Sequence, residues 1–144
     1  MNGLDFKLYQ TINIDIERSY IQLQVGKRKK KETSVYIDTN AFDCIRGLIW
    51  NKYREFGRQQ KTYQINNDDW HRILEGFKEA TTELEVCTDV TQLVSMLSLP
   101  NHLLSQKETI FEHKQALHQF IESLIQWIET HLKKEKYILI IHHT

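Results

Sequence analysis

The chain has few of the residues that build loops and cross-links: five glycines, one proline and two cysteines in 144 residues. Disordered and collagen-like chains are rich in glycine and proline, so this composition excludes both classes. Small secreted domains rely on several disulfides, whereas two cysteines favour free thiols in a reducing compartment. We therefore expect a single domain, residues 1–144, built around one hydrophobic core.

Long apolar segments are also missing. The longest apolar run covers residues 137–141, far short of the roughly 20 residues that span a bilayer as a helix. The first ten residues, MNGLDFKLYQ, have neither the basic segment nor the apolar centre of a signal peptide. The sequence therefore predicts a cytoplasmic protein that makes no contact with a membrane.

Sequence motifs that carry chemistry are absent as well. The chain has no glycine-rich phosphate-binding loop and no Gly-x-Ser-x-Gly nucleophile turn. Its seven histidines include no His-Glu-x-x-His pair, and neither Cys44 nor Cys87 has a histidine at local spacing. We therefore predict no cofactor, no metal ion and no enzymatic activity. The alternative is an active site assembled from separated side chains, for which the candidates are His71, His113 and His118.

Alternating apolar residues predict a β-sheet in the N-terminal third. The alternation has period two and includes Ile12, Ile14, Ile16, Ile21, Leu23 and Val25. A turn at residues 18–19 would pair Ile14 with Leu23. A third strand, residues 34–38, would then pair Val35 with Val25 and Ile37 with Leu23, which places every apolar side chain on one face.

The remainder of the chain predicts helices and a final strand. The apolar spacing gives helices over residues 40–57, 67–86, 89–99 and 105–134, with a short strand at residues 61–65 between the first two. The last helix would be about 45 Å long, so it either bends or projects from the domain. Residues 137–141 are apolar on both faces, as in an interior strand. The predicted fold class is α+β: an antiparallel sheet of N-terminal strands and a C-terminal strand, packed with about four helices, one of them long and C-terminal.

Charge sums to zero, with 19 basic and 19 acidic residues, but it is sorted along the chain. Residues 67–90 contain seven acids and two bases. Glu75, Glu79 and Glu83 are spaced four apart, so they lie along one line of the predicted helix, where like charges repel each other. Together with Asp69 they predict either a solubilising face or, as the more specific hypothesis, a surface that is complementary to a basic partner.

A basic run, Lys27–Lys31, is expected in the loop between two strands. Lys29 and Lys30 at its tip are candidates for contact with phosphates or with an acidic protein. The run contains no aromatic residue and the chain is neutral, whereas nucleic-acid-binding domains have a basic excess. A small nucleic-acid-binding regulator is therefore the alternative to a protein-binding function, and a solvated loop is the third possibility.

In size, strand–helix–strand order and sorted charge, the chain resembles the small immunity proteins of bacterial contact-dependent inhibition and polymorphic toxin systems. This resemblance is one of general format and involves no shared motif. It implies a cytoplasmic, non-enzymatic protein that binds and neutralises one cognate toxin, such as a basic nuclease domain. The candidate contact residues remain those chosen from charge.

Overall fold

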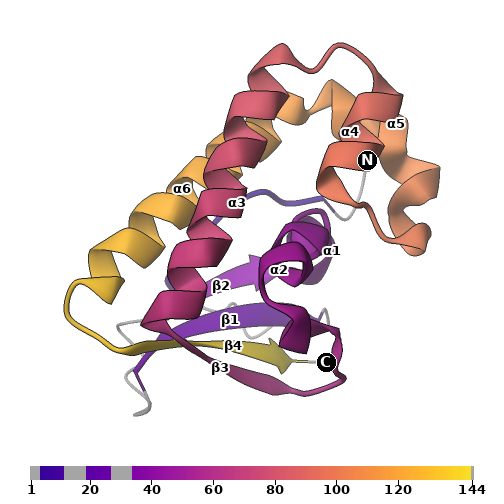
Figure 1. Ribbon diagram of the computed structural model, residues 1–144. Helices are drawn as coiled ribbons and strands as arrows, with labels where there is room; N and C mark the ends of the chain where they lie inside the picture. Colours follow the sequence, from indigo (N-terminus) through magenta and orange to yellow (C-terminus); the bar gives the residue numbers. More distant parts are fainter. Residues whose placement is uncertain (1–3, 12–18, 27–33, 144) are drawn as a thin grey trace.

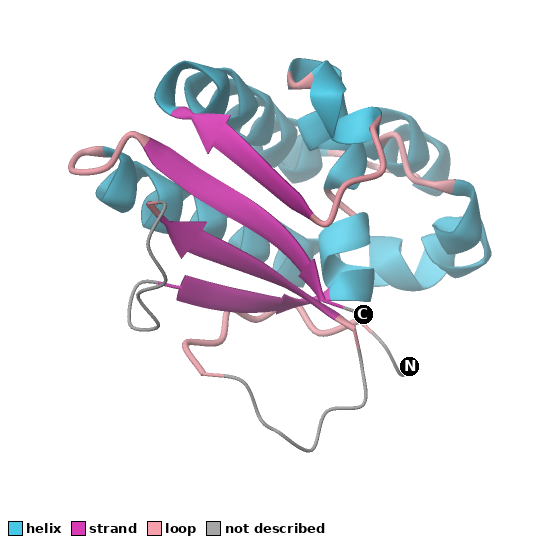
Figure 2. Ribbon diagram, turned by 90° about the horizontal axis from the view of Figure 1, so that it is seen from below, coloured by secondary structure: helices cyan, strands magenta, loops and turns pink. Residues whose placement is uncertain are grey.

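The structure is a computed structural model that describes residues 4–11, 19–26 and 34–143. Its centre is an antiparallel sheet with the strand order β2-β1-β4-β3. The strands are β1 (Tyr20–Val25), β2 (Ser34–Asp38), β3 (Thr62–Asn66) and β4 (Tyr137–His143). Helices cover one face of the sheet, and α3 and α6 lie side by side across it (Figures 1 and 2). The predicted α+β fold with a returning C-terminal strand is confirmed.

Strand β4 lies between β1 and β3, which confirms the interior position predicted from its apolar residues. Strand β1 pairs with β2 as expected, but Leu23 rather than Val25 lies opposite Val35. The register therefore differs from the prediction by two residues. Such a shift keeps the same side chains on the buried face, so the alternation of apolar residues fits both registers equally well.

The second edge of β1 pairs with β4, where Leu23 lies opposite Ile140. The prediction that Leu23 pairs with Ile14 is therefore wrong, because both edges of β1 are already hydrogen-bonded to β2 and β4. Ile140, from the far end of the chain, is as suitable an apolar partner for Leu23 as Ile14 would be. The rest of that predicted strand, including Ile12 and Ile16, lies outside the described residues.

The helical segments are shorter than predicted because two of the four are interrupted. The first predicted helix forms α1, α2 and a 3-10 turn, and the last forms a 3-10 turn, α5 and α6. The segments are α1 (Thr39–Asp43), α2 (Arg46–Lys52), η2 (Arg54–Gly57), α3 (Asn67–Val86), α4 (Val90–Leu97), η3 (Asn101–Gln106), α5 (Lys107–Glu112) and α6 (Lys114–Leu132). The last predicted helix is interrupted at His113, whose ring Nδ1 lies 2.8 Å from the Thr109 carbonyl oxygen. Among the described helices none is both long and apolar enough to cross a membrane.

Helix α3 packs against the sheet through the stripe that its sequence predicts. The buried side chains of this stripe are Trp70, Ile73, Leu74, Phe77 and Leu84. The indole N–H of Trp70 donates a hydrogen bond to the carbonyl of Ile138, with 3.1 Å between the atoms. This contact fixes the rotation of α3 over β4, and therefore also fixes which helix residues face solvent.

Candidate partner-binding surface

The acidic side of α3 is directed to solvent. Asn66 caps the helix by accepting a hydrogen bond from the backbone N–H of Asp69 at 2.9 Å. From this start, Glu75, Glu79 and Glu83 all fall on the exposed side of the helix. Their predicted exposure is confirmed, and their role in binding stays a prediction.

Two of the four predicted acids already have a cation beside them. Asp69 forms an ion pair with Arg72, one turn along the same helix. Glu79 lies 3.5 Å from the amine of Lys52 on α2. Glu75 and Glu83 form no ion pair with any residue that the structure describes. These two carboxylates are therefore the most available to a partner.

The end of α3 carries negative charge where the helix itself disfavours it. The helix contains six carboxylates and two basic residues, and its last turn has no basic residue. Glu83 and Glu85 lie near this C-terminal end, where the helix dipole is negative and acidic groups are destabilising. His118 of α6 lies 3.3 Å from Glu85 and offsets this repulsion only when the imidazole is protonated. A basic partner would supply the missing positive charge.

An exposed apolar side chain adjoins these acids. Val86 is 72% exposed, against 41% for Trp50 and for Tyr9, the next most exposed large hydrophobic side chains described. It lines a pocket of about 500 Å³ between the end of α3 and α4, together with Glu83 and Met96. An apolar centre bordered by polar groups is the usual composition of a protein–protein interface. Sequence reasoning missed Val86 because one valine at a helix end breaks no periodic pattern.

The other predicted candidates are not brought together at this surface. Lys29 and Lys30 lie outside the described residues, so their role stays a prediction. His71 is exposed on α3 and His113 is exposed between α5 and α6. His118 contacts Glu122 on its own helix at 3.3 Å, as its spacing predicts. Within the described part of the chain, no three His, Cys, Asp or Glu side chains are placed to hold a metal ion.

The two cysteines occupy buried positions as free thiols. Burial raises the pKa of the Cys44 thiol to about 12, and the neighbouring Asp43 carboxylate acts in the same direction. Because the thiolate is the nucleophilic form, Cys44 stays protonated and unreactive at neutral pH. Cys44 follows α1, is 0% exposed and packs in the hydrophobic core.

Comparison with known proteins gives no relative. No protein-family model matches this chain. Neither a curated protein nor a solved structure matches it significantly.

Proposed function

We propose that this chain is a non-enzymatic cytoplasmic binding protein that neutralises a cognate protein toxin, in the manner of an immunity protein. One observation carries the proposal: carboxylates line the exposed side of α3 as far as Glu83 and Glu85 near its C-terminal end, where they do not stabilise the isolated helix and where they adjoin the exposed Val86. A basic surface on the partner would supply both the counter-charge and the apolar cover for this patch.

The carboxylates of this surface would attract the partner at long range, and its apolar side chain would contact the partner at short range. Glu75, Glu79 and Glu83 would attract a basic partner over several ångströms and accelerate encounter. Val86 would then be buried at the centre of the contact, where apolar area contributes most to affinity. An acidic helix seated in the cationic cleft of a nuclease would exclude the polyanionic substrate, and this exclusion would neutralise the toxin.

The test starts from the protein recovered, with an affinity tag, from its own cells. Native mass spectrometry is expected to show a complex with one basic protein. The double variant E75K/E83K should recover at least about tenfold less of that protein. The matched control E108K/E112K makes the same change of charge on α5, where both glutamates are exposed, and should recover it normally.

Neutralisation is tested separately by producing the recovered partner in cells with and without this chain. Growth arrest that the wild-type chain relieves and E75K/E83K does not relieve would support the proposal. A bound oligonucleotide in place of a protein would contradict it and would favour the nucleic-acid-binding alternative. A partner whose activity is unaffected by this chain would also contradict it.

A further inference from the structure

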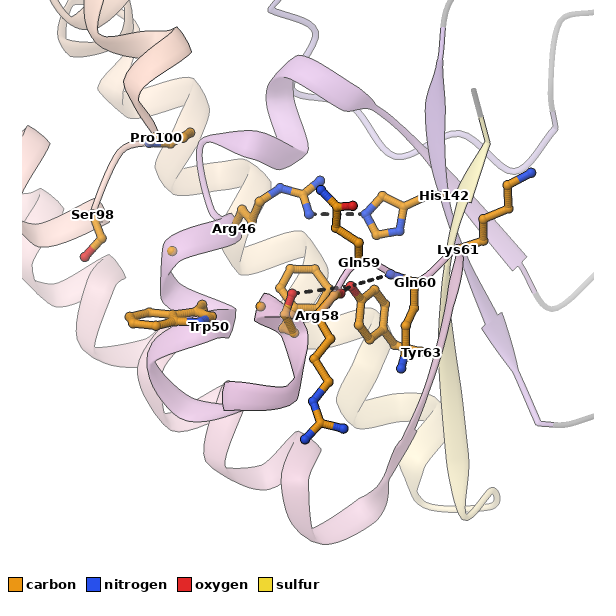
Figure 3. A pocket seen from close by; sticks show the side chains of 13 residues that line it. Arg46, Trp50, Arg58, Gln59, Gln60, Lys61, Tyr63, Ser98, Pro100 and His142 are labelled. Atoms are coloured by element: carbon orange, nitrogen blue, oxygen red, sulfur yellow. Dashed lines mark hydrogen bonds between the residues drawn. The ribbon is translucent and has the colours of Figure 1, made fainter.

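A pocket of about 720 Å³ opens beside α2, and none of the residues that line it belongs to α3. Figure 3 shows its side chains, which come from α2, the turn η2, the segment that follows it, β3, the chain after α4, and β4. The lining that matters for binding consists of Arg46, Trp50, Phe56, Tyr63, Pro100 and His142. A volume of several hundred Å³ is typical of small-molecule sites.

Arg46 is held in place on four sides. Its Nε donates a hydrogen bond to Asp43 at 2.8 Å, and its Nη1 donates one to Nε2 of His142 at 3.2 Å. The guanidinium carbon lies 5.3 Å from the ring centres of Phe42 and Phe56. A guanidinium has five N–H groups, so three of them have no hydrogen-bond partner among the described residues. Arg46 is thus a fixed cation with free donors at the pocket.

His142 orients Arg46 without adding charge. Arginine is only a donor, so Nε2 of His142 must accept the hydrogen bond and the imidazole is neutral in this arrangement. Burial lowers the pKa of His142, and the adjacent Arg46 lowers it further. Phe56 and Tyr63 surround the ring, with centroid distances of 6.1 and 5.7 Å.

The segment that forms the pocket rim is anchored to the sheet. The Tyr63 hydroxyl contacts the carbonyls of Phe56 and Arg58 and accepts a hydrogen bond from the Gln60 N–H at 3.3 Å. The carbonyl of Lys61 accepts a hydrogen bond from the backbone N–H of His142 at 2.7 Å. These contacts fix the pocket before any ligand arrives, which reduces the entropy lost on binding.

Trp50 forms the other side of the pocket and is 41% exposed. A Cβ atom added to Gly57 would lie 2.7 Å from the indole nitrogen of Trp50, so glycine at this position lets the indole edge approach the backbone. Arg54 covers part of the indole, with its guanidinium carbon 4.0 Å from the ring centre. The exposed remainder is a planar apolar surface.

The charges of the lining all have one sign. The residues that line the pocket include Arg46, Arg58 and Lys61 and no carboxylate. In Figure 3 the charged ends of Arg58 and Lys61 extend away from Arg46, so they contribute long-range positive potential rather than direct contact.

We propose that this pocket binds a small ligand in which an oxyanion is attached to a planar ring. The oxyanion would pair with the free N–H groups of Arg46, whose planar fork matches phosphate and carboxylate. The ring would pack against the exposed part of Trp50. This site is separate from the acidic surface of α3. Ligand binding in the pocket can therefore be tested independently of any protein partner that binds to α3.

The test is isothermal titration calorimetry with the full chain and four probes. Adenosine monophosphate carries ring and phosphate, adenosine the ring alone, inorganic phosphate the anion alone, and phenylacetate a ring with a carboxylate. A probe with both parts is expected to bind at least tenfold more tightly than adenosine or phosphate. The comparison of adenosine monophosphate with phenylacetate decides which oxyanion is preferred.

Variants assign the contacts. W50A, at an exposed position, should lower the affinity for the best probe at least tenfold. R46K should lower it as much, because lysine keeps the charge but lacks the planar fork of N–H donors. R58Q/K61Q should weaken it about threefold at low ionic strength and less at high ionic strength. The matched control K133Q/K136Q removes two exposed cations near the opposite end of β4 and should change nothing.

Three results would overturn the proposal. The first is no binding of either two-part probe at millimolar concentration. The second is binding of inorganic phosphate with the same affinity as the two-part probes, which would identify an adventitious ion only. The third is unchanged affinity in W50A and in folded R46K, with folding checked by thermal melting. Binding of a 5′-phosphorylated dinucleotide more than tenfold more tightly than adenosine monophosphate would also contradict a small ligand. It would indicate that the pocket binds the end of a nucleic acid.

Discussion

Trp70 donates a hydrogen bond from its indole N–H to the carbonyl oxygen of Ile138, at 3.1 Å, and thereby joins α3 to the central strand β4. Trp70 is 1% exposed, so the contact is closed to water. A buried carbonyl that loses its donor is costly, because no solvent molecule replaces it. The orientation of α3, and with it the acidic surface, depends on this contact.

Replacing Trp70 with phenylalanine removes the donor and part of the buried volume. We expect the free energy of unfolding to fall by about 2 kcal/mol, as measured by urea denaturation. The control W50F changes a tryptophan that is 41% exposed and should alter stability by less than about 0.5 kcal/mol. Equal effects of the two substitutions would show that the Trp70 contact does not stabilise the fold.

Gly47 allows α2 to touch the chain at the end of α4. A Cβ atom at this position would lie 2.5 Å from the Leu97 carbonyl oxygen and 2.7 Å from that of Ser98. These are backbone atoms that cannot move aside, so G47A should destabilise the protein by about 2 kcal/mol or more. In the control G76A, the added Cβ atom would lie 3.1 Å from the flexible side chain of Lys52 and at an ordinary contact distance of 3.8 Å from the Leu48 carbonyl oxygen. This control should be neutral or stabilising by up to about 1 kcal/mol, and thermal melting of both variants distinguishes the two cases.

His142 should make stability depend on pH. Burial and the Arg46 charge lower its pKa in the folded state from the ordinary value of 6.5, while the Asp43 carboxylate acts in the opposite direction and His143 reinforces the lowering. The unfolded chain therefore takes up a proton at higher pH than the folded chain, and the stability due to neutral His142 is lost as the pH falls below about 6.5.

The variant H142Q keeps an acceptor for Arg46 but does not titrate. Its free energy of unfolding should fall less steeply than that of the wild type between about pH 7.5 and pH 5, as measured by urea denaturation at each pH. The control H71Q replaces an exposed histidine and should follow the wild-type curve. A wild-type slope retained in H142Q would rule out this coupling.

The fold class and the buried faces could be predicted because they follow from the period of apolar residues. The stripe of α3 and the interior position of β4 are examples. The pairing of β1 could not be predicted, because the sequence pattern alone makes Ile14 and Ile140 equivalent apolar partners for Leu23. The length of the last predicted helix indicated that it bends or projects, but the position of its interruption at His113 could not be predicted, because apolar residues recur on both sides of His113.

The acidic surface could be anticipated in part, because spacing by four places Glu75, Glu79 and Glu83 on one line of a helix. The ion pair of Glu79 with Lys52 could not, since it depends on how α2 packs against α3. The pocket of Arg46 and His142 was also beyond sequence reasoning, because its two central residues are 96 positions apart.

The central claim is that the acidic side of α3 binds a basic protein, and the association rate of the partner recovered from cells tests it most directly. Stopped-flow measurements at several salt concentrations would compare the wild type, E75K/E83K and the control E108K/E112K. We predict that E75K/E83K associates at least about tenfold more slowly than the wild type at low salt and shows a flatter salt dependence, while the control stays close to the wild type. The same rate and the same salt dependence in E75K/E83K as in the wild type would contradict the claim.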